Sequence, residues 1–373
     1  MKNKKIKVVF GMNDFLVGGV QRLFVEQLRY FDRDTFEIVL ITLFQFSDQQ
    51  DFYAELPPDI EIHRLNFMSV RDVRSWWQLY QLLRQLKPDI VVSSLFFSNT
   101  VFRILKLFCG FHVIACEHNT YTEKTWAQRR VDRILALWSY RIMAVSKTVA
   151  IFTSKQERIP YKKFAIIHNG VDIKKIQTEL EQLPASDVLK RDLGFKSSDR
   201  IILSVARLVP QKNHTLLLDG FALFYRTHPD YKLAIVGGGG LQSMLEAYAN
   251  ELGIADAAVF FGTRQDIWKF YKICDFFVSA SLIEGFGIAH AEALACGIPV
   301  VTTKTAGPDV LIQEGVNGYF ISEYTPKAVA DTLEKAVASD TVTMGAAAKE
   351  SVQKYSIERS VKAYESLFAE AVL

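Results

Sequence analysis

Short apolar runs alternate with longer segments of helical periodicity along nearly the whole chain. This alternation predicts strands joined by crossover helices, and therefore parallel sheets of the α/β class. In the first half, strands are expected at 6–10, 36–43, 60–65, 90–94, 113–117, 141–145 and 164–167, and helices at 20–31, 73–85, 99–108 and 128–139. With 373 residues, of which 49% are hydrophobic, the chain is long enough for two separate cores.

A change in composition predicts the boundary between these cores. Residues 1–172 form one expected domain, which ends in a turn at 168–172 after its last strand. Residues 173–199 are rich in Lys, Glu, Gln and Asp and contain Pro184, which favours a connector. Residues 200–354 form the second domain, and 355–373 are a final helix with an apolar stripe.

Two carboxylates, Glu284 and Glu292, are eight residues apart on either side of a Gly285-Phe286-Gly287 turn. An apolar run precedes the turn and a helix-forming run follows it, so the segment predicts strand, glycine loop and helix N-terminus. Such a loop presents backbone N–H groups and the positive end of a helix dipole to an anion. The alternative is a solvated helix start. We favour carboxylates that accept hydrogen bonds from sugar hydroxyls beside the anion.

Two cations follow another expected strand, 201–206. Arg207 directly follows this strand and Lys212 lies five residues further on. A planar guanidinium and a point charge at the carboxyl end of a strand suit a diphosphate, although a solvated loop is the alternative. The next strand, 232–236, runs into four glycines that begin with Gly237, which allows close approach of a ligand.

Together these motifs resemble the retaining glycosyltransferases of family 4, which have the GT-B architecture. The matching elements, in chain order, are Gly18-Gly19, His168-Asn169-Gly170-Val171-Asp172, Arg207 with Lys212, Phe261-Gly262, the segment from Glu284 to Glu292, and Gly297-Ile298-Pro299-Val300-Val301. The resemblance covers nearly the whole chain. It implies two Rossmann-like, doubly wound parallel-sheet domains facing a cleft, with helix 355–373 packing back on the first.

The resemblance implies that the second domain binds the nucleotide-sugar donor and the first domain binds the acceptor. Arg207 and Lys212 would neutralise the departing diphosphate. Glu292 would accept from ribose hydroxyls and Glu284 from sugar hydroxyls near the reacting carbon. The other implied donor contacts are Gly19, Gly237, Arg264, Gly285, Phe286 and Gly287.

His118 follows the expected strand 113–117, at the end where α/β proteins bind ligands. The resemblance implies a catalytic role for it, either positioning the acceptor or contacting the donor sugar, and a structural histidine is the alternative. Glu117 beside it is a second polar candidate. His290 is expected to pack on its own helix, without a catalytic role.

No metal and no cofactor are expected, and the nucleotide-diphosphate sugar is a co-substrate. The triplet Asp32-Arg33-Asp34 resembles a metal-binding pattern of the other major glycosyltransferase architecture, but it lies in a connecting turn after a helix. None of the four cysteines forms a Cys-x-x-Cys pair, which disfavours a zinc site or a disulfide framework. Since Arg207 and Lys212 supply the positive charge, metal-independent activity is predicted.

Neither a secretory leader nor a spanning helix is expected. The apolar run at 6–10 is too short for a leader, and the lipid-like stretch 95–114 is interrupted by Arg103, Lys106 and His112. These patterns favour a cytoplasmic protein, either free or peripheral on the cytosolic face of a membrane.

Positive charge is concentrated in the first domain. Residues 1–172 carry 24 Lys and Arg against 17 Asp and Glu, and within 124–163 ten basic residues accompany two acidic ones and two tryptophans. Basic and aromatic side chains together suit an anionic membrane surface or acceptor, with a solvated helix face as the alternative. Nucleic acid is disfavoured because no recognition motif accompanies the charge.

The sequence therefore predicts a retaining transferase that moves a hexose or N-acetylhexosamine, from a favoured UDP-sugar or alternatively GDP-mannose, to a glycan or polyprenyl-linked acceptor in surface polysaccharide or glycolipid synthesis. A nucleotide-sugar epimerase of the same architecture is the first alternative. A non-catalytic sugar-nucleotide-binding module is the second.

Overall fold

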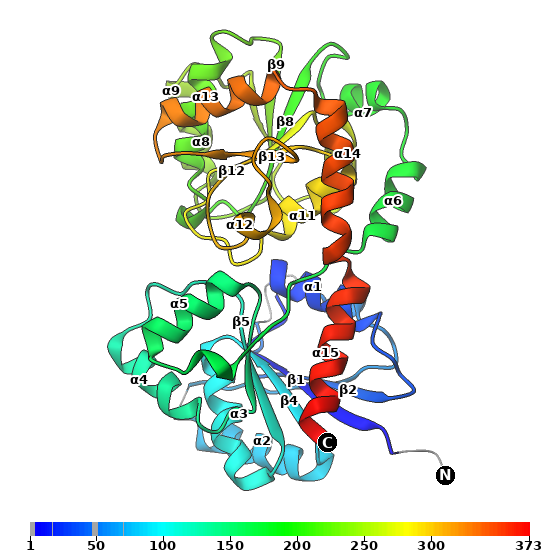
Figure 1. The fold of residues 1–373 in the computed structure, drawn as a ribbon, viewed down its shortest axis with the longest axis vertical. Coiled ribbons are helices and arrows are strands. Elements are labelled where there is room, and N and C mark those ends of the chain that lie inside the picture. The colour runs from blue at the N-terminus through cyan, green and yellow to red at the C-terminus, as the bar shows by residue number, and fades with distance from the viewer. Residues whose placement is uncertain (1–3, 17, 47–50, 70) are drawn as a thin grey trace. The chain divides into compact units, whose positions relative to one another are not determined.

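The computed structural model describes residues 4–16, 18–46, 51–69 and 71–373. The chain divides into two compact units, one of residues 1–170 together with 357–373 and the other of residues 171–356. Each unit contains its own parallel sheet, which confirms the predicted α/β class with two Rossmann-like sheets (Figure 1).

The sheet of the first unit has seven strands in the order β3-β2-β1-β4-β5-β6-β7. The strands are β1 (Ile6–Met12), β2 (Phe36–Thr42), β3 (Glu61–Arg64), β4 (Ile90–Ser94), β5 (His112–Glu117), β6 (Arg141–Ala144) and β7 (Phe164–Ile166). All described pairs are parallel, and the strand order reverses direction between β1 and β4. This doubly wound order was predicted.

Helices cover both faces of this sheet. They are α1 (Gly19–Leu28), α2 (Val73–Leu86), α3 (Phe96–Cys109), α4 (Trp126–Leu135), α5 (Lys147–Glu157) and α15 (Ile357–Val372), with short 3₁₀ turns η1 (Tyr53–Glu55) and η2 (Tyr161–Lys163). Helices α2 to α5 contact one another in sequence on one face, whereas α1 and α15 lie together on the other (Figure 1). Ser146 caps α5 by accepting from the Val149 N–H.

Helix α15 completes the core of the first unit. Its Phe368 is fully buried and contacts the rings of Phe10, Phe31 and Phe36 at centroid separations of 6.2, 5.9 and 5.8 Å. The predicted final helix therefore packs on the sheet made by the beginning of the chain.

The sheet of the second unit has six parallel strands in the order β10-β9-β8-β11-β12-β13. The strands are β8 (Arg200–Val205), β9 (Tyr231–Val236), β10 (Ala258–Phe260), β11 (Phe276–Ser279), β12 (Val300–Thr303) and β13 (Gly318–Ile321). The helices are α6 (Ile173–Gln182), α7 (Ser186–Asp192), α8 (His214–Tyr225), α9 (Gln242–Glu251), α10 (Trp268–Ile273), α11 (Ile288–Cys296), α12 (Pro308–Leu311), α13 (Pro326–Val337) and α14 (Thr341–Val352), with 3₁₀ turns η3 (Pro210–Lys212) and η4 (Gln353–Tyr355).

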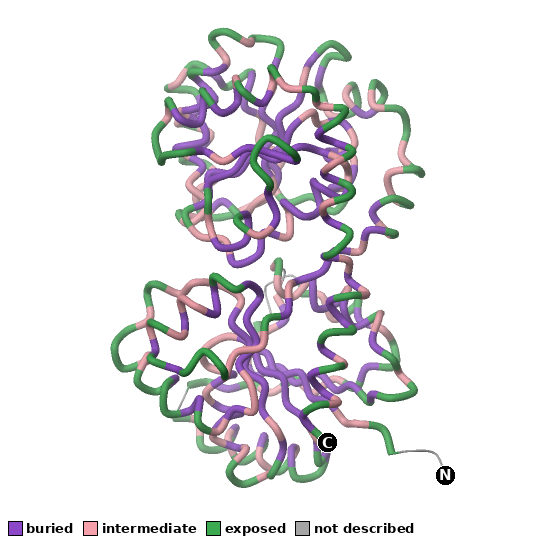
Figure 2. Tube along the Cα trace, viewed as in Figure 1, coloured by how far each residue is buried: buried purple, intermediate pink, exposed green. Residues whose placement is uncertain are grey.

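In both units the buried residues follow the central strands, and exposed residues lie on the outer sides of the helices (Figure 2). Residues 173–199, expected as a connector, instead form α6 and α7 within the second unit. Helices α6 and α7 bury only Ile173, Ile176 and Leu189. Their composition is therefore mostly polar, and the sequence did not indicate that they pack on the second unit. In the described part of the chain no helix combines the length and apolarity needed to span a membrane.

Candidate functional site

The candidate residues of the second unit gather at the carboxyl ends of β8 and β11. These strands are neighbours, and the chain proceeds from them toward opposite edges of the sheet. In open α/β sheets, ligands bind outside such a switch point because the loops on its two sides diverge. The two loops are also joined here, since Leu282 N–H donates to the Gln211 carbonyl at 2.9 Å and the Gln211 amide donates to the Ile283 carbonyl at 2.8 Å.

Lys212, at the end of η3, forms an ion pair with Glu284 from the loop after β11. Each side chain is only 15% exposed. Burial alone would raise the pKa of Glu284, but Lys212, His290 and the Ser281 hydroxyl more than offset it and hold this pKa below its ordinary value. Glu284 is therefore ionised. Besides its ion pair with Lys212, its carboxylate can accept hydrogen bonds.

Arg207 occupies the second loop position after β8, behind Ala206, and it is exposed. Among the described residues, its guanidinium has no ion-pair or hydrogen-bond partner. An exposed guanidinium and a half-buried ammonium on one loop can hold two adjacent anionic groups.

Glu292 lies in the second turn of α11 and is 9% exposed. The Tyr271 hydroxyl of α10 donates to its Oε2 at 2.9 Å and fixes the carboxylate. The sequence reasoning missed Tyr271, because no local pattern connects two residues on different helices.

The glycine turn before α11 has the predicted form. Gly287 is the N-cap of α11 and has φ +84°, a conformation that favours glycine. Phe286 is 2% exposed and its ring packs edge-on against Tyr355 at 5.6 Å, so its side chain belongs to the core. Gly285 is buried beside it.

The loops after β8, β9 and β10 are stacked against one another. Ala206 N–H donates to the Val236 carbonyl at 3.0 Å, Leu208 N–H to Gly238 at 2.9 Å, and Gly237 N–H to Gly262 at 2.8 Å. Gly237 has φ +136°, and a Cβ there would lie 2.0 Å from the Ala206 carbonyl oxygen. The glycine at 237 was predicted to allow close approach of a ligand. In the structure it allows close approach of the loops after β8 and β9.

The side chain of Arg264, in the loop after β10, is engaged locally. Its Nε and Nη2 each donate to the Asp266 carboxylate at 2.8 Å, and this bidentate pair lowers the pKa of Asp266 to about 2. Any ligand contact at this position is therefore expected from the backbone of Arg264.

His290 is buried on α11 and its Nε2 lies 2.9 Å from the Thr302 hydroxyl. Burial lowers its pKa to about 4, so the ring is neutral in the folded protein at pH 7. The unfolded chain, with an ordinary pKa near 6.5, binds the extra proton first as the pH falls. Stability contributed by His290 is present above pH 6.5 and is lost toward pH 4.

His290→Gln is expected to reduce this pH dependence, because glutamine stays neutral and can still bond to Thr302. Between pH 8 and pH 5 the wild type should lose about 2 kcal/mol of stability more than the variant. Denaturant melts at several pH values would measure the difference. His63→Gln, on β3 where no such burial exists, is the control, and equal slopes for His290→Gln and wild type would contradict the prediction.

In the first unit, His118 lies at the carboxyl end of β5, as predicted. Its Nε2 is 3.1 Å from the Ser94 hydroxyl at the end of β4, and burial lowers its pKa to about 4. Its buried Nδ1 has no hydrogen-bond partner among the described residues. A neutral imidazole with one unsatisfied nitrogen is suited to form a hydrogen bond with the hydroxyl of a bound ligand.

Two other predicted residues of the first unit have different surroundings from those expected. Gly19, expected in a loop, is the first residue of α1 and is exposed. Glu117 is 3% exposed and its carboxylate lies 3.4 Å from Lys124, so it belongs to an internal charge cluster. Asp32, of the Asp-x-Asp triplet, lies in the connecting turn expected for it and accepts there from Thr35 and Asp34.

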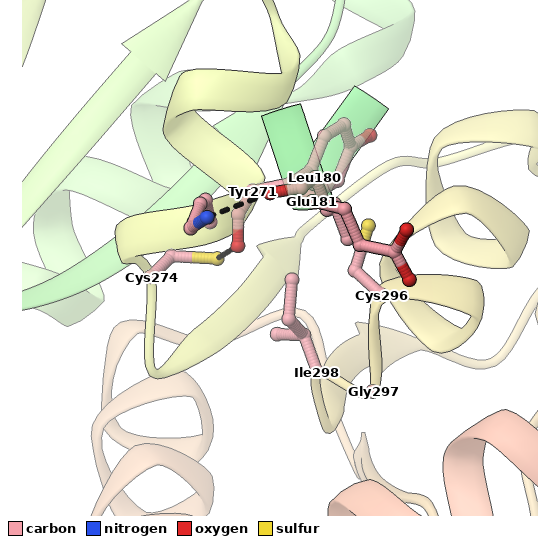
Figure 3. A pocket seen from close by; sticks show the side chains of 8 residues that line it. Leu180, Glu181, Tyr271, Cys274, Cys296, Gly297 and Ile298 are labelled. Atoms are coloured by element: carbon pink, nitrogen blue, oxygen red, sulfur yellow. Dashed lines mark hydrogen bonds between the residues drawn. The ribbon is translucent and has the colours of Figure 1, made fainter. Parts of the chain in front are cut away.

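A separate pocket of about 390 Å³ lies at the opposite edge of the second sheet (Figure 3). It is lined by Leu180, Glu181, Tyr271, Lys272, Cys274, Cys296, Gly297 and Ile298. Since Cys274 and Ile298 precede β11 and β12, this pocket is at the amino ends of the strands, and it shares Tyr271 with the candidate site at their carboxyl ends. Within the described residues, no group of three or more potential metal ligands occurs.

Comparison with known proteins identifies two sequence families. Residues 186–355 match the family described as Glycosyl transferases group 1, and residues 17–175 match the one described as Glycosyltransferase Family 4. A UDP-Gal:alpha-D-GlcNAc-diphosphoundecaprenol alpha-1,3-galactosyltransferase of Escherichia coli is 26% identical over 333 residues, which cover 86% of this chain and 84% of that protein.

Two further matches extend this comparison. An N-acetylgalactosamine-N,N'-diacetylbacillosaminyl-diphospho-undecaprenol 4-alpha-N-acetylgalactosaminyltransferase of Campylobacter jejuni is 37% identical over 143 residues, or 38% of this chain and 35% of that protein. The crystal structure of Anabaena Alr3699/HepE in complex with UDP superposes with a TM-score of 0.83 at 20% identity, covering 98% of this chain and 100% of that one. At this identity the structural match establishes the fold.

Proposed function

This chain belongs to the family 4, group 1 glycosyltransferases of GT-B fold, and from that premise we propose that it transfers a hexose or N-acetylhexosamine from a UDP-sugar to a lipid-linked saccharide. The observation that carries the proposal is the grouping of Arg207, Lys212 and Glu284 at the β8/β11 switch point of the second unit. Cations and a hydroxyl-accepting carboxylate side by side match a nucleoside diphosphate joined to a sugar.

In this proposal the second unit binds the donor. Arg207 and Lys212 bind the two phosphates and stabilise the charge that develops as the diphosphate leaves. Glu284 orients Lys212 and accepts from a sugar hydroxyl, and Glu292, fixed by Tyr271, accepts from the ribose. Backbone N–H groups of Arg264, Gly285, Phe286 and Gly287 complete the donor site, and Gly237, whose own N–H is bonded to Gly262, contributes a backbone without a side chain.

We propose that the first unit binds the acceptor, with His118 contacting the reacting groups. Gly19, at the start of α1, provides backbone without a side chain beside the donor phosphates. Because Glu284 is already paired with Lys212, it is a poor nucleophile. Retention of configuration is therefore assigned to attack on the same face as the leaving diphosphate, with catalysis by positioning and charge stabilisation.

A donor-binding series by thermal shift tests this function. UDP, GDP and ADP sugars are added in EDTA, and the true donor class should raise the melting temperature as its concentration rises. The shift should disappear in Glu292→Ala. Absence of any shift would overturn the donor site. Turnover of a nucleotide sugar to its epimer without acceptor would instead support an epimerase, and loss of activity in EDTA would contradict metal independence.

A lipid-linked acceptor is supported by the printed names of the Escherichia coli and Campylobacter jejuni relatives, which specify undecaprenol-linked substrates. The outer side of α4 and of the turn that follows it, which contains Leu137, also suits an anionic membrane. Trp126 and Leu137 are 75% and 73% exposed, and Arg130 and Arg133 are exposed between them at helical spacing. We propose that this basic-apolar face rests on the cytosolic surface of a membrane during surface polysaccharide or glycolipid synthesis.

Replacing Trp126 and Leu137 together by serine is expected to weaken binding to phosphatidylglycerol vesicles by about tenfold or more, because two inserted apolar side chains are lost. Vesicle co-sedimentation would measure this, with phosphatidylcholine vesicles for comparison. Val342→Ser, an exposed apolar residue of α14, is the control. If the double variant bound the anionic vesicles as the wild type does, the proposed membrane face would be wrong.

A further inference from the structure

Behind His118, the first unit contains a cluster of five buried charged side chains. Lys124 Nζ lies 3.4, 2.9 and 2.6 Å from carboxylate oxygens of Glu117, Asp132 and Glu157. Arg103 Nη1 binds the other oxygen of Asp132 at 2.9 Å. Every one of these side chains is 8% exposed or less.

The cluster joins parts of the unit that are distant in sequence. Glu117 ends β5, Arg103 is on α3, Asp132 on α4 and Glu157 on α5. Lys124 alone lies outside regular structure, immediately before Thr125, the N-cap of α4. It is therefore the contact by which an irregular segment is tied to the surrounding strand and helices.

The charges of the cluster do not balance if all groups are ionised, because three carboxylates face two cations. An uncompensated buried charge is costly, so one proton is expected to be retained. Burial raises the pKa of Glu117 and raises that of Glu157 to about 8, which is consistent with a shared proton. At neutral pH the cluster is then close to electrically neutral and its geometry is stable.

The irregular segment tied down by Lys124 is the loop that begins with His118. Glu117 directly precedes this loop and Lys124 closes it, so residues 118–124 have both ends anchored in the cluster. The middle is held from the same helices, since the Gln156 amide donates to the Tyr121 carbonyl at 3.0 Å and Arg129 to the Thr122 carbonyl at 3.2 Å.

We propose that Lys124 is a positioning residue, which clamps the loop 118–124 so that His118 is held against Ser94 with Nδ1 left for the reacting groups. The inference rests on the proposed role of His118 in transfer. A stabilising role alone is a weaker account, because buried ion pairs contribute little net stability compared with apolar packing. The arrangement instead fixes both ends of one functional loop.

The test is the ionisation of His118 in the full chain. With ¹³C-labelled histidine, the His118 signal is assigned by its absence in His118→Gln, and is followed from pH 4 to pH 8. In the wild type, it should titrate near pH 4. In Lys124→Met the loosened loop admits water, so the midpoint should move toward the ordinary value of about 6.5.

Arg103→Met is the matched control, because it removes a cation from the same cluster without releasing the loop. It should lower thermal stability as Lys124→Met does, yet leave the His118 titration near its wild-type midpoint. An unchanged His118 midpoint in Lys124→Met, or an equal change in Arg103→Met, would overturn the proposal. If Lys124→Met does not fold, the double variant Lys124→Met/Glu157→Gln is used in its place, because it keeps the net charge of the cluster.

Turnover provides the second measurement, with UDP-galactose and a short-chain prenyl-diphospho-N-acetylglucosamine as probes. Lys124→Met should lower kcat about 10- to 100-fold, as misplacement of a catalytic group does, and should add little to the loss in a His118→Gln background. Additive losses would contradict positioning through His118. If His118→Gln turns over normally, the proposed role of His118 fails, whereas the titration still decides whether Lys124 clamps the loop.

Discussion

Lys212→Met should lower kcat/KM of the transfer reaction by about 100- to 1,000-fold, the loss typical when one charge-stabilising donor is removed from an active site. The variant loses the cation assigned to the leaving diphosphate. It also leaves the mostly buried Glu284 without the partner that offsets its burial. Steady-state kinetics in EDTA, with the donor selected by the thermal-shift series, would measure the loss.

The pH dependence of the residual activity separates these two effects. Without Lys212, burial dominates and the pKa of Glu284 should rise above its ordinary value, so ionised Glu284 is recovered as the pH increases. Residual activity should therefore increase toward alkaline pH relative to the wild type. Lys269→Met, a partly exposed lysine of α10 paired with Asp266, is the control. A kcat/KM within threefold of wild type would refute the assignment of Lys212.

Gly237→Ala should lower the stability of the second unit by about 3 to 5 kcal/mol, through combined overpacking and backbone strain. The added Cβ would lie 2.0 Å from the Ala206 carbonyl oxygen, and neither backbone can move without breaking the hydrogen bonds between the loops. Calorimetry should show its melting temperature lowered by roughly 10 °C. Donor binding should weaken as well, because Arg207 follows Ala206 directly.

Gly240→Ala, three residues further along the same loop, is the matched control. A Cβ there meets no atom within 4 Å, and its φ is not in the left-handed region. Its melting temperature should stay close to that of the wild type. Equal melting temperatures for the two alanine variants would show that the close approach at Gly237 relaxes easily, contrary to the prediction.

Much of the fold could be predicted because each strand and helix is encoded locally. Strand 90–94, for example, was predicted at its observed bounds. The prediction of a connector at 173–199 was wrong for a physical reason. Helices α6 and α7 bury only a few side chains, so their composition resembles that of a solvated linker.

The positions of the candidate residues at strand ends were predictable, but their contacts were not. Arg207, Lys212 and Glu284 could each be placed at the carboxyl end of a strand. The pairing of Lys212 with Glu284 depends on β8 lying beside β11, which is a property of the sheet order. Tyr271 and Lys124 were missed because their partners lie on other elements, and no spacing in the sequence connects them.

His214 is a further residue that the sequence did not single out. It is 3% exposed at the start of α8, and neither ring nitrogen has a hydrogen-bond partner among the described residues. Burial and the nearby Lys212 lower its pKa to about 4. The burial of His214 depends on tertiary packing, so no local sequence pattern distinguishes it from an ordinary helix residue.

The return of α15 to the first sheet has a consequence for synthesis on the ribosome. Phe368 fills the space among Phe10, Phe31 and Phe36, yet it is translated after the entire second unit. The nascent first unit must therefore keep an apolar face uncovered while 171–356 emerge and fold. During that interval a chaperone could bind this apolar face. A chain that ended before residue 357 would lack α15, and the apolar face of its first unit would stay uncovered.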